Sequence, residues 1–175
     1  MLLLCYMPWQ HLTESYQFEY NKTALYAEEH AMKLLIIDGQ SGRLGAQIIE
    51  GLIKAGLPEG HTIVAVGTNA LATSGMINAG AHQGATGENA VAVQCRSADL
   101  IIGPIGIVLA DAMLGEITPR MAEAVGQSSA MRILIPSSRC STYVVGVAAQ
   151  SRRQQIDDAV MKALACLENP EQFQH

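Results

Sequence analysis

The chain has 175 residues, of which 49% are hydrophobic and 15% are charged, and its net charge is −5 at pH 7. This length and apolar content are typical of a single globular domain. The acidic balance argues against a nucleic-acid-binding protein, which needs clustered Lys and Arg side chains, and no run approaches the ~20 apolar residues of a membrane span.

Residues 1–31 differ in composition from the rest of the chain. They contain six of the eight aromatic residues and no glycine. Met32 and Lys33 then open a predicted strand at once, as at the start of many bacterial reading frames. We expect residues 1–31 to be an extension, either a mis-called start or a disordered tail, although residues 23–32 also have the composition of a helix. One domain is expected over residues 32–168, with a tail over residues 169–175.

The four cysteines are widely spaced along the chain, at Cys5, Cys95, Cys140 and Cys166. They form no Cys-x-x-Cys or Cys/His pattern, so the sequence assigns no metal site. The spacing is also unlike that of a secreted disulfide framework. We therefore expect reduced thiols in a cytoplasmic protein.

From residue 33 onward, short apolar runs alternate with helical patterns. The run LLIID predicts a buried strand over residues 34–38 because it is continuously apolar. A helix is predicted next, with apolar residues at 44, 48, 49 and 52, and Gly56 is expected to end it. A strand over residues 61–67, a helix over residues 70–80 and a polar, glycine-rich loop over residues 79–90 follow.

The second half of the chain gives a similar alternation. We predict a helix over residues 88–97 and a strand over residues 99–103, with a strand over residues 90–95 as the alternative. Helices are expected over residues 105–114 and 118–125, the latter with Thr118 as N-cap and Pro119 in its first turn. Strands over residues 131–136 and 142–148 and an amphipathic helix over residues 150–169 complete the pattern. The alternation predicts an α/β fold, a Rossmann-like three-layer sandwich with a mostly parallel sheet.

A glycine-rich turn joins the first predicted strand to the first helix. Gly39, Gly42 and Gly45 recur at three-residue spacing, with Ser41 and Arg43 between them. Glycine allows a phosphate to approach the backbone, and the amides at the start of the helix attract an anion. The turn therefore predicts a phosphate-binding site, and the alternative is a closely packed turn without a ligand.

Polar and glycine residues also follow the other predicted strands. Ligands of open α/β sheets bind at the carboxyl ends of the strands, and these ends are Asp38, Gly67, Thr68, Asn69, Gly103, Gly106 and residues 136–140. Asp38 would repel a pyrophosphate unless a metal or Arg43 intervenes, and it could instead hold the turn by accepting backbone hydrogen bonds. The second strand ends without an acidic residue, which disfavours NAD and leaves NADP open.

Other residues are weaker candidates for chemistry. His82, Glu88 and Asn89 lie in the predicted polar loop and could contact a ligand or act in acid–base catalysis. Cys140 follows Arg139, whose charge would lower the pKa of a thiol. For these four residues a solvated or structural role is the alternative. Glu116 is expected to cap the helix that begins near Thr118.

Two resemblances follow from these residues. The turn GQSGRLG resembles the dinucleotide-binding turn of dihydrodipicolinate reductases. The span from Met32 to about Ala148 resembles a bacterial family, the domain of unknown function three-eight-four-two, through the runs IDGQSGRLG, VAVGTNALATSGMINAGA, GATGENAV, ADLIIGPIGIVLADAMLGEITPRMAEAVG, ILIP and YVVGV. The second resemblance implies a small single-domain protein and supplies no catalytic residues.

The main functional hypothesis is the binding of a small phosphorylated ligand, a nucleotide or dinucleotide such as NADP, at the turn from Gly39 to Gly45. One alternative is a non-enzymatic regulatory or interaction module that forms a homodimer. Another is a metal-assisted enzyme that acts on a phosphorylated metabolite through Asp38.

Overall fold

The computed structural model describes residues 31–136, 142–147 and 150–170. Its strands are β1 (Lys33–Asp38), β2 (Thr62–Gly67), β3 (Gln83–Thr86), β4 (Leu100–Pro104) and β5 (Met131–Ile135). Its helices are α2 (Arg43–Lys54), α3 (Ala70–Asn78), α4 (Glu88–Gln94), the 3₁₀-helix η1 (Ile105–Val108), α5 (Pro119–Gln127) and α6 (Arg152–Glu168).

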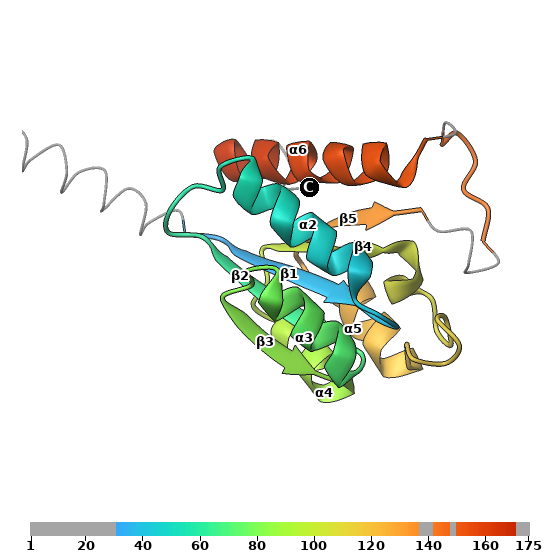
Figure 1. Cartoon of the computed structure of the whole chain (residues 1–175). Helices are drawn as coiled ribbons and strands as arrows, with labels where there is room; N and C mark the ends of the chain where they lie inside the picture. The colour runs from blue at the N-terminus through green and yellow to red at the C-terminus, as the bar shows by residue number, and fades with distance from the viewer. Residues whose placement is uncertain (1–30, 137–141, 148–149, 171–175) are drawn as a thin grey trace, which may run out of the picture. The chain divides into compact units, whose positions relative to one another are not determined.

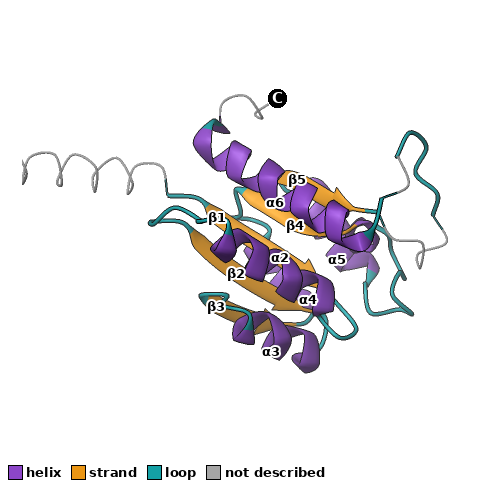
Figure 2. Ribbon diagram, turned by 45° about the horizontal axis from the view of Figure 1, so that its top comes forward, coloured by secondary structure: helices purple, strands orange, loops and turns teal. Residues whose placement is uncertain are grey.

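The five strands form one parallel sheet in the order β3-β2-β1-β4-β5. Helices α2, α3 and α6 cover one face, and α4 and α5 cover the other (Figures 1 and 2). This confirms the predicted Rossmann-like three-layer α/β sandwich.

The alternation of side chains along β1 builds both halves of the core. Leu34 and Ile36 pack in one cluster with residues of α2 and α6, whereas Leu35 and Ile37 pack in a second cluster with residues of α4 and α5. Successive side chains of a strand point to opposite faces, so a central strand covered on both sides must be apolar throughout. The continuous apolar run that predicted β1 is therefore a direct consequence of its central position.

The helix boundaries follow the predicted capping signals. Gly56 has a φ of 82° just after α2, and the next amide, that of Leu57, donates to the Leu52 carbonyl oxygen at 3.0 Å, as in a Schellman motif. Thr118 caps α5, whose first residue is Pro119. The Ser151 hydroxyl caps α6 in a capping box with Gln154.

Three predictions about secondary structure are wrong. Residues 83–86 form the edge strand β3 inside the predicted loop, because the backbone pairs with β2 while three of its four residues remain exposed. Only residues 105–108 of the predicted helix over residues 105–114 are helical. The chain then turns back on itself, and the Asp111 amide donates to the Ile117 carbonyl oxygen at 2.8 Å.

The third wrong prediction is the strand over residues 142–148. Residues 142–147 contain a turn instead, with Tyr143 87% exposed and Val145 86% exposed. Ala148 lies outside the described residues. The alternative strand over residues 90–95 is also wrong, because most of that segment belongs to helix α4.

Candidate functional site

A pocket of about 570 Å³ opens at the carboxyl ends of β1 and β4. The chain proceeds from β1 towards β3 on one side of the sheet and from β4 to β5 on the other. These neighbouring strands therefore define the topological switch point, where open α/β sheets bind their ligands. Four of the predicted site residues line this switch-point pocket: Asp38, Gly39, Ser41 and Arg43.

Asp38 lies at the base of the pocket and is 5% exposed. Its Oδ1 accepts a hydrogen bond from the Gly39 amide at 2.8 Å, and its Oδ2 accepts one from the Gly45 amide at 2.8 Å. Burial raises the pKa of this carboxyl group, although the amides act in the opposite direction. Gly45 is the third residue of α2, and its amide was expected to donate a hydrogen bond to a ligand phosphate. In the structure this amide donates to the Asp38 carboxylate instead.

The three glycines of the turn also have reasons within the fold. A Cβ atom on Gly42 would lie 2.6 Å from the backbone of Ala72 in α3, and Gly42 has a φ of 64°. A Cβ atom on Gly39 would lie 2.8 Å from Glu116, Met113 and Thr68. One on Gly45 would collide with Met76 of α3. The glycine spacing thus permits α2 and α3 to approach closely, as in the closely packed alternative.

Glu116 brings a second carboxylate to the same turn. Its Oε2 accepts hydrogen bonds from the Gln40 amide at 2.7 Å, from the Asn69 side-chain amide at 3.2 Å and from the Thr68 hydroxyl. Burial acts to raise the pKa of Glu116, but these hydrogen bonds together lower it. An acidic group therefore stands at the end of β2 after all, supplied by a loop 47 residues beyond Asn69 in sequence.

Thr68 and Asn69 thus contact Glu116, and Asn69 has a further role. Its Oδ1 accepts a hydrogen bond from the Ala72 amide at 2.9 Å and so caps α3. Its side-chain amide also donates to the Gln40 carbonyl oxygen at 2.9 Å. These contacts connect the end of β2 to the glycine turn.

Two arginines supply positive charge at the rim of the pocket. Arg43 begins α2 and Arg152 begins α6, and both are exposed. One Arg152 guanidinium nitrogen donates to the Pro136 carbonyl oxygen at 3.2 Å. No described residue forms an ion pair with Arg43. The pocket therefore combines a buried carboxylate below with two cationic side chains above.

The remaining predicted glycines lie within the framework. Gly67 and Gly103 are buried at the ends of β2 and β4, and Gly106 is buried in η1. A Cβ atom on Gly67 would lie 2.7 Å from the Asn69 carbonyl oxygen, and one on Gly103 would lie 3.0 Å from Ile107. None of the three lines the switch-point pocket.

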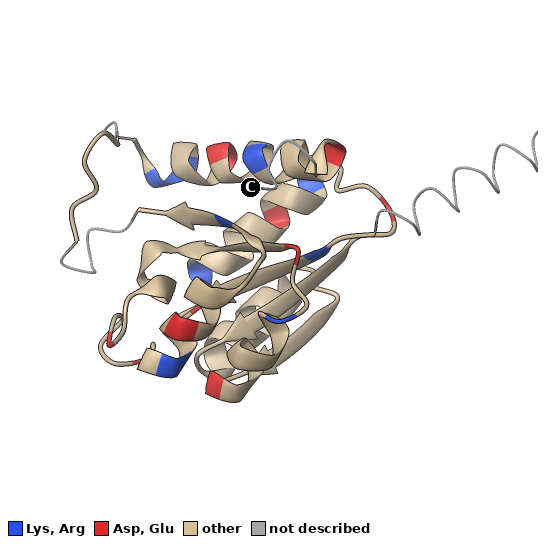
Figure 3. Cartoon of the chain, turned by 180° about the vertical axis from the view of Figure 1, so that it is seen from behind, with Lys and Arg blue, Asp and Glu red and all other residues tan. Residues whose placement is uncertain are grey.

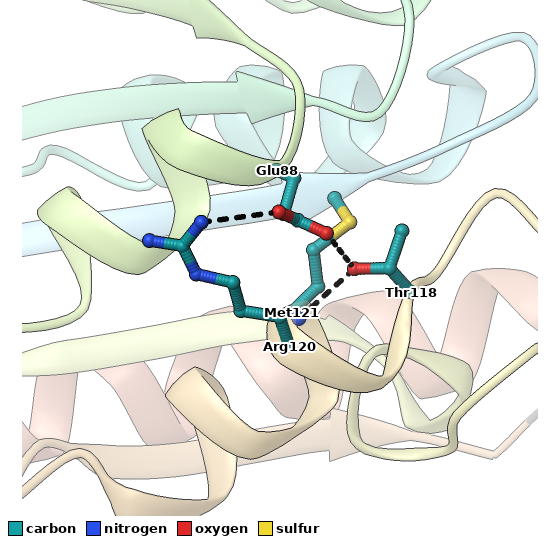
Figure 4. Close-up of polar contacts among 4 residues, drawn as sticks. All are labelled: Glu88, Thr118, Arg120 and Met121. Carbon is teal, nitrogen blue, oxygen red and sulfur yellow. Dashed lines mark hydrogen bonds and ion pairs between the residues drawn. The ribbon is translucent and has the colours of Figure 1, made fainter.

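Glu88 and His82 have structural contacts. The Glu88 carboxylate accepts a hydrogen bond from the Thr118 hydroxyl at 2.6 Å and pairs with Arg120 at 3.2 Å, which connects the start of α4 to the start of α5 (Figure 4). His82 Nδ1 accepts a hydrogen bond from the Ile63 amide at 2.8 Å. Asn89 is exposed. Cys140 and Arg139 lie outside the described residues.

Several residues of the site were missed or misjudged from the sequence, among them Gln40, Met113, Glu116 and Arg152. Glu116 was expected to cap the helix that begins near Thr118, but its carboxylate contacts the glycine turn and the end of β2 instead. Arg152 lies in the segment predicted as an amphipathic helix and was not a candidate site residue, yet it lines the pocket. The sequence did contain one signal for Arg152. The connection from the last strand to the last helix starts at the carboxyl edge of a parallel sheet, so the start of that helix was a candidate for the ligand side. Met113 carried no such signal, because its loop was predicted to be helical.

A second cavity, of about 470 Å³, lies between α4 and α5, away from the carboxyl ends of the strands. Charges of both signs alternate along α6 (Figure 3). Within the described ranges, no helix is long and apolar enough to cross a membrane. The same part of the chain contains no group of three or more His, Cys, Asp or Glu side chains placed to hold a metal ion.

The family described as "Domain of unknown function (DUF3842)" has a sequence model that matches residues 33–168. No curated protein matches the chain. Among solved structures, the chain is similar to a dodecameric FMN-dependent Ubix-like decarboxylase from Escherichia coli O157:H7, with a TM-score of 0.37 and 18% sequence identity. That match covers 78% of this chain and 76% of the decarboxylase chain.

Proposed function

The chain belongs to the DUF3842 family, and we propose that it binds a small phosphorylated ligand in the switch-point pocket. The observation that carries the proposal is the convergence of Arg43 and Arg152 on a pocket at the junction of β1 and β4. Arginine forms bidentate, charge-assisted hydrogen bonds with phosphate oxygens. The volume of about 570 Å³ lies within the ordinary range for ligand sites.

The ligand's phosphate lies at the outer side of the glycine turn, near Ser41 and Arg43. It does not reach the Gly45 amide, because Asp38 already accepts that hydrogen bond. A buried carboxylate repels a phosphate placed beside it, whereas the exposed arginines attract one. The proposed site therefore keeps Ser41 and Arg43 as ligand contacts and gives Asp38 the role of holding the turn.

A nucleotide or dinucleotide is the ligand class to test first, with NADP among the candidates. In the position that it holds in this structure, the Glu116 carboxylate at the end of β2 repels a 2′-phosphate, so NADP would bind there only after Glu116 moved away. We expect NAD or a mononucleotide to bind more tightly than NADP. This revises the preference that the uncharged end of β2 suggested.

Isothermal titration calorimetry on the full chain with AMP, ADP, NAD and NADP tests the proposal. Arg152→Ala should weaken binding of the tightest ligand by at least about tenfold, since a hydrogen bond to a charged group contributes roughly 1.5–3 kcal/mol. Arg153→Ala is the matched control, because Arg153 is the next residue of α6 and pairs with Asp157 at 3.9 Å. Equal affinities for the two variants, or no binding of any of the four nucleotides, would refute the proposed nucleotide site.

Self-association is a second candidate function. Leu114 is 97% exposed, and Tyr143 and Val145 are also largely exposed, whereas large apolar side chains are usually buried. Light scattering at several protein concentrations measures the oligomeric state directly. A dimer that dissociates in the double variant Leu114→Ser, Tyr143→Ser would support this function, and a monomer at all concentrations would exclude it.

The metal-assisted alternative has less support from the geometry. Both carboxylate oxygens of Asp38 accept hydrogen bonds from backbone amides. This arrangement favours the role of holding the turn, which the sequence also allowed. We therefore do not assign a reaction to this residue.

A further inference from the structure

Three hydrogen-bond donors converge on a single oxygen atom beside the switch-point pocket. They are the Gln40 amide in the glycine turn, the Thr68 hydroxyl at the end of β2 and the Asn69 side-chain amide at the start of α3. The atom that they surround is Oε2 of Glu116. The three donors thus already bind one oxyanion, the carboxylate of the chain's own Glu116.

The bound carboxylate comes from a loop rather than from a helix or strand. Residues 109–116 lie between two fully buried side chains, Ile107 and Ile117. Asp111, Met113 and Leu114 adopt left-handed φ values of 61°, 57° and 62°, which non-glycine residues rarely do. The donors, in contrast, belong to the turn and strand ends of the packed sheet. Rotation of the Glu116 side chain alone would free these donors without any change in the sheet.

The position of Glu116 is continuous with the pocket. Gln40 and Met113 both line the pocket. The Gln40 amide donates a hydrogen bond to Glu116, and the Met113 side chain lies beside Gly39, as the Glu116 carboxylate does. Arg43 lies on the same turn, three residues after Gln40. A ligand phosphate that replaced the Glu116 carboxylate would therefore lie beside the glycine turn, which also lines the switch-point pocket.

We propose that Gln40, Thr68 and Asn69 form an anion-binding site that Glu116 occupies in the free protein and that a phosphate group of the ligand takes over when residues 109–116 move away. A phosphate offers three or more acceptor oxygens where the carboxylate offers two, so it can satisfy the same donors. This inference extends the proposed function by adding a second phosphate contact and a movable loop. It does not depend on the Arg152 contact.

Calorimetric titration of the full chain with inorganic pyrophosphate at constant ionic strength tests this site. Glu116→Ala should bind pyrophosphate at least tenfold more tightly than the unmodified chain, because the competing carboxylate is gone. Glu116→Gln should show a smaller gain, because its carbonyl oxygen still accepts hydrogen bonds from the same donors. Glu123→Ala is the matched control for loss of one negative charge, since Glu123 is exposed on α5 and accepts a hydrogen bond from Gln127.

The proposal is overturned if Glu116→Ala binds pyrophosphate no more tightly than Glu123→Ala. If Glu116→Ala does not fold, amide NMR of the unmodified chain with pyrophosphate decides the question. Shifts of the Gln40 and Thr68 amides together with those of residues 111–115 support the site, and their absence at millimolar pyrophosphate overturns it. An effect of Glu116→Ala without an effect of Arg152→Ala would retain this site and refute the nucleotide contact at Arg152.

Discussion

Replacing Gly42 with alanine should destabilise the protein even when no ligand is present. Gly42 has a φ of 64°, and a Cβ atom there would lie 2.6 Å from the Cα and carbonyl oxygen of Ala72. The left-handed conformation costs a non-glycine residue about 1–2 kcal/mol, and overpacking adds about 1–3 kcal/mol. Alanine recovers about 0.4–1 kcal/mol by restricting the unfolded chain. We therefore expect a net loss of about 1–4.5 kcal/mol.

Equilibrium unfolding in urea, followed by circular dichroism, measures this loss as a lower midpoint at constant m-value. Gly126→Ala is the matched control, because Gly126 lies in α5 and a Cβ atom there would meet nothing within 4 Å beyond the backbone of its own helix. That substitution should stabilise the protein by up to about 1 kcal/mol. The two glycine-to-alanine variants therefore change stability in opposite directions.

A Gly42→Ala variant as stable as the unmodified chain would refute this reasoning. The close approach of α2 to α3 would then not require glycine, and the spacing of the turn would need a ligand to explain it. Because the substitution disturbs packing, Gly42 is also a poor position at which to test ligand binding, and Arg152 is a better one.

Three further predictions are measured on the protein without a ligand. Glu116 has a lowered pKa in the fold. Its carboxylate therefore stabilises the protein fully above its ordinary pKa of about 4.3, and this contribution is lost as the pH falls through the folded pKa. The difference in free energy of unfolding between the unmodified chain and Glu116→Gln, measured in urea, should therefore shrink as the pH falls below about 4.3. Ser151→Ala removes the capping box of α6 and should lower the free energy of unfolding by about 1 kcal/mol in the same assay. Cys95 is buried and burial raises its pKa to about 11, so it should resist alkylation by iodoacetamide at pH 8 in the folded protein and react fully in urea, as peptide mass spectrometry would record.

The glycine turn illustrates why a motif and its function can separate. The sequence correctly places Gly39, Gly42 and Gly45 between a buried strand and a helix. Glycine has the same conformational freedom whether its neighbour is a phosphate or a helix backbone. The spacing alone therefore left both interpretations open, and contacts with Ala72, Met76 and Glu116 give each glycine a structural role.

Local signals were sufficient for most of the framework. Continuous apolar runs predicted β1, β2 and β4, and the capping residues Thr118 and Gly56 marked the ends of two helices. The helix predicted over residues 105–114 was wrong beyond residue 108, because an apolar run has the same composition in a helix and in a folded loop. Strand β3 was missed because a short edge strand is held mainly by backbone hydrogen bonds, which leave little trace in the side chains.

The sequence by itself determined a parallel α/β sandwich, because hydrophobic periodicity and capping are properties of neighbouring residues. It also placed Asp38 at a strand end and allowed it the role of holding the turn. Only the tertiary structure decided that Glu116 meets Gln40, Thr68 and Asn69, and that Arg152 faces the same pocket as Arg43. These arrangements bring together residues 47 to 109 positions apart in the sequence, and they depend on how the sheet and its loops pack rather than on any local pattern.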